Sequence, residues 1–311
     1  MMPEGPEVRT ISSGVNRVLK SSGGHNLVSM SVLSGRYTKH GDPKGWGEMI
    51  ESLNKGGGKK VEEWKCKGKF QYLTLEGGYS IWVTLGMSGK FEFASSDGAT
   101  IGRHGRVMFC FEPMDGSGVK RLIFDDARNF GTVRCCSDVK ELEDKLGTIG
   151  PDILEVGEGE LTAEDFVGIV RGLRTNPNVC KFLMNQKRLS GVGNYILAEG
   201  LYKANVDPWI GVKDVEDETL KALITALKET ATTSFQAQGL TRSSGGTFRS
   251  LDGSKGKFEF KLMVYGKETC PKGEKVWRIV DGPHGRAIWF VMSQVEEGRR
   301  DDIRLIAEKK K

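Results

Sequence analysis

Gly191-Val192-Gly193-Asn194-Tyr195-Ile196-Leu197-Ala198-Glu199 is the stretch of this 311-residue chain that says most about its fold. Its glycines permit tight turns, and they join a helix predicted near Val179–Met184 to another predicted over Asn194–Ala204. The backbone amides at the start of the second helix can bind an anion such as phosphate. Glycine turns between helices are common, but the continuation to Asn205-Val206-Asp207-Pro208 is distinctive.

Helical signals surround this stretch. Acidic and helix-forming residues dominate from about residue 137 to 235, with further helices predicted after the cap residue Thr162 and over Asp217–Thr230. Apolar residues at helical spacing also predict a helix from about residue 5 to 20. This first helix should end before Ser21-Ser22-Gly23-Gly24, which is a stop signal.

Between these helical regions, residues 26–135 alternate apolar and polar side chains in short runs separated by glycine-rich turns, which predicts a β-sandwich. Residues 239–256 are rich in Gly, Ser and Thr and should form a mobile loop. Residues 257–266 and 276–292 are expected to be the strands of a hairpin, followed by a charged, frayed tail over 298–311.

The predicted class is therefore α+β, with an N-terminal β-sandwich flanked by helices and a C-terminal helical domain followed by a β-hairpin. The predicted parts are an N-terminal β-sandwich domain, a linker, a helical domain that includes the loop, a hairpin and a basic tail. Their predicted bounds are 1–136, 137–158, 159–256, 257–297 and 298–311.

Composition sets wider limits on function. The formal net charge of +5, from 46 basic and 41 acidic residues, permits a nucleic-acid partner without requiring one. No apolar run has the roughly 20 residues of a membrane span, and the amphipathic N-terminus does not resemble a signal peptide. The six cysteines form no disulfide-like framework, so we expect an intracellular protein: nuclear if eukaryotic, otherwise in the cytoplasm or nucleoid.

The chain begins Met1-Met2-Pro3-Glu4-Gly5-Pro6-Glu7. If the methionines are removed, Pro3 presents a secondary amine, and an α-amino group of ordinary pKa, about 7.7–8, is partly neutral near pH 7. Such an amine can attack an aldehyde-level carbon and form an iminium ion, with the neighbouring Glu4 as proton donor or acceptor. The alternative is that the two prolines only start a helix.

These features together resemble the Fpg/Nei family of DNA glycosylases along nearly the whole chain. The resemblance implies an N-terminal proline nucleophile, a helix–two-turn–helix element at Gly191–Glu199, and a loop that covers the damaged base. The matching stretches are Pro3-Glu4, Leu85-Gly86-Met87-Ser88-Gly89, Asp126-Ala127-Arg128-Asn129-Phe130-Gly131, Gly191–Glu199, Gly245-Gly246-Thr247-Phe248 with Asp252-Gly253-Ser254-Lys255-Gly256, and Met263-Val264-Tyr265-Gly266.

The resemblance also implies a role for individual residues. Pro3 would be the nucleophile, Glu4 the acid and base, and Lys69 the contact to the phosphates beside the lesion. Glu7 and Glu199 are expected to support the active site, the latter by helping to place Pro3. The remaining implied DNA contacts are Met87, Arg128 and Phe130, which would fill the gap left by an extruded base, and Asn194 with Arg286, which would hold the phosphate backbone.

Two departures from the family pattern are informative. Cys270-Pro271-Lys272-Gly273 keeps one cysteine, and Val291 and Gln294 stand where a second pair would be, so we expect no zinc, no other cofactor and a zincless finger. This feature and the Pro-Glu-Gly-Pro-Glu start resemble the Nei-like branch, which favours oxidised pyrimidines. The doubled methionine would block Pro3 unless translation starts at Met2, and we predict that start.

The sequence thus predicts a bifunctional DNA glycosylase and abasic-site lyase of base excision repair, acting as a monomer on damaged duplex or single-stranded DNA, without a membrane partner. If Pro3 is blocked, the alternative is a catalytically inactive protein that binds damaged or single-stranded DNA. A structural RNA-binding protein is a third class, because helix–two-turn–helix elements occur in ribosomal proteins, but it leaves Leu85–Gly89 and Asp126–Gly131 unexplained.

Overall fold

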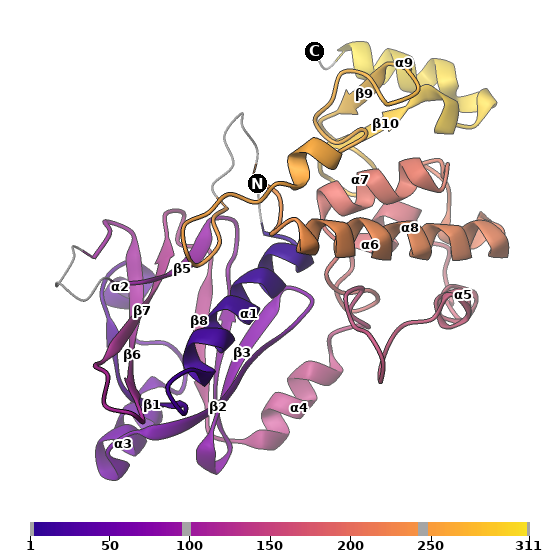
Figure 1. Cartoon of the computed structure of the whole chain (residues 1–311). Coiled ribbons are helices and arrows are strands. Elements are labelled where there is room, and N and C mark those ends of the chain that lie inside the picture. Colours follow the sequence, from indigo (N-terminus) through magenta and orange to yellow (C-terminus); the bar gives the residue numbers. More distant parts are fainter. Residues whose placement is uncertain (1–2, 95–100, 242–247, 310–311) are drawn as a thin grey trace. The chain divides into compact units, whose positions relative to one another are not determined.

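The computed structural model describes residues 3–94, 101–241 and 248–309 (Figure 1). The chain divides into two compact units: Met1–Thr148 with Ala237–Lys257, and Ile149–Gln236 with Phe258–Lys311. The first is built on a β-sheet and the second is mainly helical, which confirms the predicted α+β class. Within the described ranges, no helix combines the length and the apolar character that a membrane span requires.

The first unit contains an eight-stranded antiparallel sheet in the order β5-β7-β6-β1-β2-β3-β4-β8. Only two residue pairs join β1 to β2, so the sheet consists of two four-stranded halves. The strands are β1 (His25–Val32), β2 (Lys59–Lys67), β3 (Phe70–Leu75), β4 (Tyr79–Thr84), β5 (Gly89–Phe93), β6 (Gly105–Pro113), β7 (Lys120–Asp126) and β8 (Thr132–Cys136).

The two halves pack face to face around an aromatic core. The ring of Trp64 on β2 lies 5.1 Å from that of Phe91 on β5 and 6.5 Å from that of Phe109 on β6, both edge-on. All three side chains are buried, and burying rings of this size stabilises the fold by a few kcal/mol each. The alternating pattern read from the sequence thus forms the expected sandwich.

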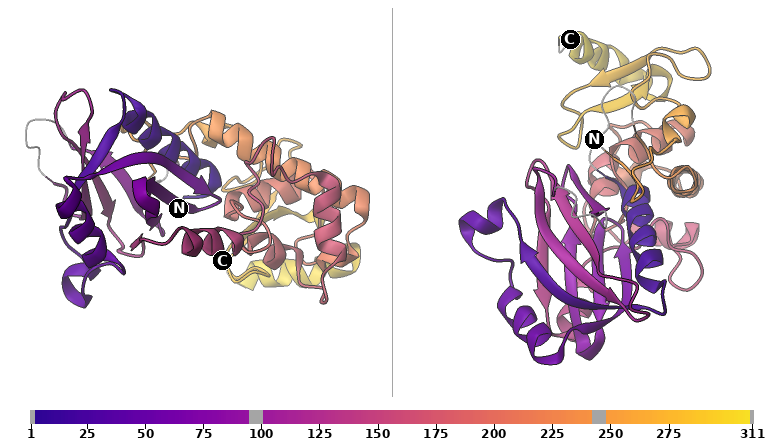
Figure 2. Two further views of the ribbon diagram at one scale, coloured as in Figure 1. Left: turned by 90° about the horizontal axis from the view of Figure 1, so that it is seen from below. Right: turned by 60° about the vertical axis from the view of Figure 1, so that its left-hand side comes forward.

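Helix α1 (Gly5–Lys20) lies against β2 (Figure 2), and its apolar side is buried. Its side chains hold the strand directly: Asn16 Oδ1 accepts a hydrogen bond from the backbone N–H of Trp64 at 3.1 Å, and the Ser12 hydroxyl donates to the Trp64 carbonyl at 3.4 Å. The helix has the bounds that the proline-rich start and the Ser-Gly stop predicted.

Three shorter helices complete the sheet-based part: α2 (Arg36–His40), α3 (Trp46–Gly56) and α4 (Val139–Gly147). The segment predicted as a linker, residues 137–158, therefore contains a helix that belongs to the first unit. Asp138 caps α4 by accepting from the Lys140 N–H at 2.8 Å, and Leu142 is buried. A capping residue and one buried side chain were too weak a pattern to distinguish this helix from a polar linker.

Residues 237–257 also belong to the first unit, although the sequence placed them in the helical domain. Leu240 and Phe248 are buried, and Phe248 is part of the core of the sandwich. Leu251 lies against Gly14 of α1. The described ends of the predicted loop are therefore anchored by apolar contacts, while Gly245, Gly246 and Thr247 lie outside the described residues.

The second unit is built on α5 (Ala163–Arg171), α6 (Val179–Met184), α7 (Asn194–Lys203) and α8 (Asp217–Gln236). A side chain at Gly191 (φ +94°) would meet Ile153, so only glycine fits the turn before α7. Gly200 allows α7 and α8 to approach closely, because a Cβ there would lie 2.4 Å from Leu227 Cδ2. The helices at 179–184 and 194–203 form where the sequence predicted them.

Two predictions about the C-terminal region were wrong. Residues 257–266 are not a strand, since they contain the short 3₁₀ helix Phe258–Lys261; the hairpin is formed by β9 (Val276–Ile279) and β10 (Ile288–Val291) alone. The tail forms helix α9 (Arg300–Lys309). Its Ile303 and Ala307, four residues apart, are buried, and the helix packs against β9, so a long-range contact orders a segment whose composition is that of a frayed end.

Candidate active site and nucleic-acid interface

The start of α1 is buried and closely held. Pro3 lies two residues before the helix and is buried, as are the Glu4 and Glu7 side chains. One carboxylate oxygen of Glu7 accepts from the backbone N–H of Glu4 at 2.9 Å, and the other accepts from the backbone N–H of Leu240 at 2.7 Å. Glu7 therefore fixes the backbone that carries Pro3 and, at the same time, the first residues of the 237–257 segment.

The beginning of α1 lies at the same end of the sandwich as Lys69. Along α1, Lys20 pairs with Glu63 and Ser12 contacts Trp64, so the helix runs antiparallel to β2 and its start points toward the β2–β3 turn. That turn is Gly68-Lys69, between strands that end at Lys67 and begin at Phe70. From Ser12 to Glu4 the helix advances about 12 Å, and from Trp64 to Lys69 the strand advances about 16 Å, in the same direction.

The three predicted gap-filling side chains lie at this end as well. Phe70 pairs with Thr84, and Thr84 with Thr132, so the turn carrying Lys69 and the loops that follow β4 and precede β8 are side by side. Met87 and Phe130 are 39% and 57% exposed, which is unusual for large apolar side chains. The Arg128 guanidinium contacts the Met87 sulfur at 3.5 Å. A cation together with two exposed apolar side chains is a combination suited to inserting into a base stack.

Asp126 and Ser88 hold these two loops together, and sequence reasoning gave neither of them a role. One Asp126 oxygen accepts from the Gly131 N–H at 2.7 Å, and the other accepts from the Ser88 hydroxyl. Ser88 in turn accepts from the backbone N–H of Arg128 at 2.9 Å. Asp126 is fully buried. The signal was present, because Asp126 and Ser88 are polar residues within the two quoted motifs.

In the second unit, Asn194 and Arg286 are brought to one place. The Asn194 side chain donates to the Ala287 carbonyl at 2.8 Å and accepts from His284 Nε2 at 2.8 Å, so the hairpin turn lies at the start of α7. Burial and the Arg286 charge lower the pKa of His284 to about 4, so this ring is neutral near pH 7. The exposed Arg286 belongs to the same turn, directly before Ala287, and a role for it and Asn194 in holding phosphate stays a prediction.

The Glu199 carboxylate forms hydrogen bonds within the second unit. It accepts backbone N–H groups from Met263, Val264 and Tyr265 at 2.8–3.0 Å. Burial raises the pKa of Glu199, and these three hydrogen bonds oppose that rise. The residue therefore fixes the entry to the hairpin, and a further part in placing Pro3 stays a prediction.

The donor set around the hairpin does not fit a structural zinc ion. Gln294 already uses both ends of its amide, accepting from the Val291 N–H at 3.0 Å and donating to the Val206 carbonyl at 3.1 Å. Val291 is buried and offers no donor atom, which leaves Cys270 as a single thiol. In the described ranges no three His, Cys, Asp or Glu side chains are grouped so that they could hold a metal.

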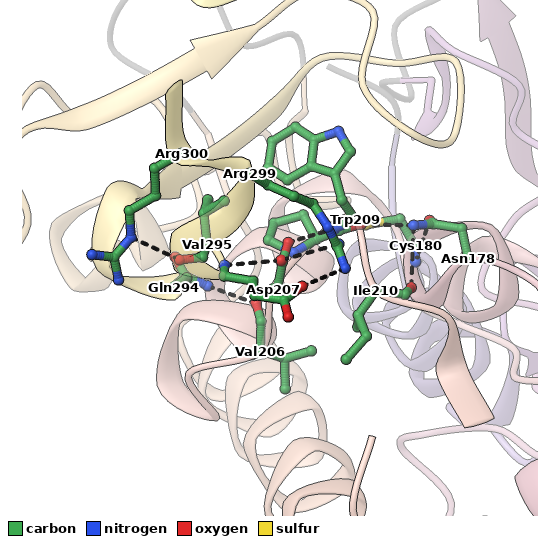
Figure 3. Close-up of polar contacts among 12 residues, drawn as sticks. Asn178, Cys180, Val206, Asp207, Trp209, Ile210, Gln294, Val295, Arg299 and Arg300 are labelled. Atoms are coloured by element: carbon green, nitrogen blue, oxygen red, sulfur yellow. Dashed lines mark hydrogen bonds and ion pairs between the residues drawn. The ribbon is translucent and has the colours of Figure 1, made fainter. Parts of the chain in front are cut away.

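Hydrogen bonds to Asp207 connect the segment that follows the hairpin to the chain after α7 (Figure 3). Asp207 accepts from the backbone N–H groups of Trp209 and Glu296 and from the Arg299 guanidinium, at 2.8, 3.1 and 3.3 Å. The Phe290 ring packs edge-on against that of Trp209 at 4.8 Å. A buried carboxylate and an apolar contact thus join these segments.

This architecture is shared with solved DNA glycosylases. The chain matches a Lactococcus lactis Fpg mutant in complex with Fapy-dG containing DNA, with a TM-score of 0.78 at 22% identity. It also matches MutM in complex with carbocyclic 8-oxo-G containing DNA, with a TM-score of 0.76 at 23% identity. Each match covers 95% of this chain and all of the other chain. At such identities the match establishes the fold alone.

Sequence comparisons identify the family. The family model for the formamidopyrimidine-DNA glycosylase N-terminal domain matches residues 2–133. The chain is 30% identical to the formamidopyrimidine-DNA glycosylase of Thermus thermophilus over 274 residues, covering 87% of this chain and 89% of that protein. It is 28% identical to that of Solibacter usitatus over 270 residues, covering 87% and 90%. The chain belongs to the formamidopyrimidine-DNA glycosylase family.

Proposed function

We propose that this protein is a bifunctional DNA glycosylase and abasic-site lyase that removes oxidised bases through a Schiff base on Pro3. The observation that carries the proposal is the gathering, at one end of the sandwich, of a buried Pro3-Glu4 start, Lys69 and the exposed Met87, Arg128 and Phe130. Family membership supports the same chemistry.

In the proposed reaction the damaged nucleotide leaves the base stack, and Phe130, Met87 and Arg128 fill the gap. The Pro3 nitrogen attacks C1′ of the deoxyribose while Glu4 assists opening or protonation at the sugar, and the base departs as the N–C1′ bond forms. The C1′–O4′ bond then breaks with protonation of O4′, which leaves an iminium ion that acidifies the C2′ hydrogen. Its loss allows β-elimination and then δ-elimination of the two flanking phosphates, which cuts the strand.

Borohydride trapping tests this mechanism. Reduction of the iminium should join the protein covalently to an oligonucleotide that carries a lesion, and digestion followed by mass spectrometry should locate the added deoxyribose on Pro3. Glu4→Gln should lower the trapping rate by about 10²–10⁴-fold, whereas the exposed Glu112→Gln should leave it unchanged. An adduct on a lysine side chain would contradict the assignment of the nucleophile.

The free Pro3 nitrogen requires that translation begin at Met2 and that this methionine be removed. Intact-mass measurement of the protein from its natural source tests this step. If a methionine stays in place and no adduct forms, the protein is the catalytically inactive binder of damaged or single-stranded DNA.

For the substrate, we propose oxidised pyrimidines and hydantoins, as in the Nei-like branch, on the basis of the Pro-Glu-Gly-Pro-Glu start and the single Cys270. Formamidopyrimidines and 8-oxoguanine are the second candidate, because the named relatives are formamidopyrimidine-DNA glycosylases. Cleavage of matched oligonucleotides carrying thymine glycol, a hydantoin, formamidopyrimidine or 8-oxoguanine separates the two: the preferred class should be cut fastest under single-turnover conditions.

A further inference from the structure

A basic hollow lies beside the Arg128–Phe130 loop, and no role has yet been given to it. It has a volume of about 650 Å³ and is lined by the α2 segment, residues 36–44, on one side and by Arg128, Asn129 and Phe130 on the other. From the α2 segment, Arg36, His40 and Lys44 face it. The hollow therefore adjoins the side chains that are proposed to enter the base stack.

The α2 segment is fixed to the outer edge of β8, which is the last strand of the sheet. The Tyr37 hydroxyl accepts from the Val133 N–H at 2.6 Å and donates to the Val133 carbonyl at 3.2 Å. The Cys135 N–H donates to the Lys44 carbonyl at 2.8 Å. These bonds use the free edge of β8, so Lys44 is held at a defined place although its side chain is exposed.

The order of the elements across this end of the sheet gives the hollow its place relative to the DNA. Lys69 precedes β3, Met87 follows β4, Phe130 precedes β8, and the α2 segment lies beyond β8. Three strand spacings, about 14 Å in all, separate Lys69 from the α2 segment. That is close to the width of the B-DNA major groove, about 12 Å, and hence to the separation of two strands. If Lys69 holds the lesion strand and the gap-filling residues stand in the stack, the hollow faces the other strand.

The charges of the hollow favour a polyanion. Arg36, Lys44 and Arg128 contribute three cations, and Asp42 is the one carboxylate among the lining residues. Arg36 also donates to the Asn129 carbonyl, so it positions the loop as well as lining the hollow. The Lys44 side chain is exposed, and it lines the hollow together with the exposed His40. Lysine suits a phosphate contact as a compact point charge.

We propose that this hollow binds the sugar–phosphate backbone of the DNA strand opposite the lesion, with Lys44 as a phosphate contact. The inference rests on the proposed function, because that function places Lys69 on the lesion strand and Phe130 in the stack. The α2 segment would then distinguish double-stranded from single-stranded DNA, because its contact exists only when a complementary strand is present. A single-stranded substrate would use Lys69 and Pro3 without it.

The test compares Lys44→Glu with Lys39→Glu in the full chain. Lys39 is exposed on the same segment and does not line the hollow, so the two variants change net charge equally. The probe is an oligonucleotide carrying a tetrahydrofuran abasic analogue, either single-stranded or in duplex, with affinity measured by fluorescence anisotropy at several salt concentrations. Lys44→Glu should weaken duplex binding about tenfold and lower the slope of log K against log salt by about 0.9, with single-strand affinity unchanged. Lys39→Glu should leave the ratio of duplex to single-strand affinity unaltered.

Equal losses on duplex and single strand, or equal losses in the two variants, would overturn the inference. Borohydride trapping of the wild-type protein on a single-stranded abasic oligonucleotide keeps this outcome separate from the proposed function. Trapping together with an unchanged affinity ratio for Lys44→Glu would refute the opposite-strand contact alone. Absence of trapping by wild type would refute the Schiff-base chemistry, whatever the affinity ratio.

Discussion

Replacing Glu7 with Gln is the most informative single change, because it preserves shape and removes one acceptor. Glu7 is fully buried, and its two oxygens accept from the N–H groups of Glu4 and Leu240 at 2.9 and 2.7 Å. A glutamine keeps one oxygen and turns an NH₂ group toward the other N–H. Hydrogen bonds to charged groups contribute about 1.5–3 kcal/mol, and a buried unsatisfied donor costs about 1–3 kcal/mol, with overlap between the two. We expect a loss of about 2–3 kcal/mol.

Urea unfolding followed by tryptophan fluorescence measures this loss, since Trp64 reports on the core of the same unit. The matched control is Glu112→Gln, an exposed strand residue, which should change stability by less than about 0.5 kcal/mol. Amide hydrogen exchange supplies a local readout: protection of the Leu240 or Glu4 amide should fall. If both amides keep their protection and the two variants have the same stability, Glu7 does not couple the N-terminus to the 237–257 segment, and the reasoning fails.

Three further outcomes are expected. The pKa of His284 is lowered from 6.5 to about 4, so between these pH values the unfolded chain binds a proton that the folded chain does not. The free energy of unfolding should therefore fall as the pH drops from 6.5 toward 4. Denaturant titrations of His284→Gln should show a flatter dependence on pH. Phe130→Ala should leave stability within about 0.5 kcal/mol, because the ring is 57% exposed, yet slow base removal from duplex DNA under single-turnover conditions; an unchanged rate would exclude its insertion. Asp207→Asn should cost about 1–3 kcal/mol by weakening the contacts to Glu296 and Arg299, whereas EDTA should not change the unfolding midpoint of the wild type.

The parts of the fold that the sequence predicted well carry their signals locally. Helix α1 has prolines at its start and a Ser-Gly stop, and α7 follows a glycine turn, so neighbouring residues alone define their bounds. Helix α9 shows the opposite case. Its charged composition resembles a frayed end, yet Ile303 and Ala307 are buried and the helix packs against β9. Distant contacts of this kind leave no pattern in a short window.

The site residues likewise fall into those that the sequence identified and those that it did not. The motifs identified the side chains that project from the protein, such as Met87, Arg128 and Phe130, because the family resemblance is concentrated in them. Residues that position parts of the site were missed, because Asp126, Tyr37 and His284 act through groups distant in the sequence or through the backbone. A side chain that bonds a distant backbone can be assigned its role only when the fold is known.

These positioning contacts explain how the exposed loops and the buried N-terminal segment are kept in place. The gap-filling loops are tied by buried Asp126, and the Pro3 backbone by buried Glu7, each using both oxygens of one carboxylate. In the second unit, Asp207 and Glu199 do the same for the hairpin. A buried carboxylate that accepts several N–H groups is favourable only when every acceptor is used, so loss of one partner is costly. Two buried carboxylates in each unit therefore hold together backbone segments that lie far apart in the sequence.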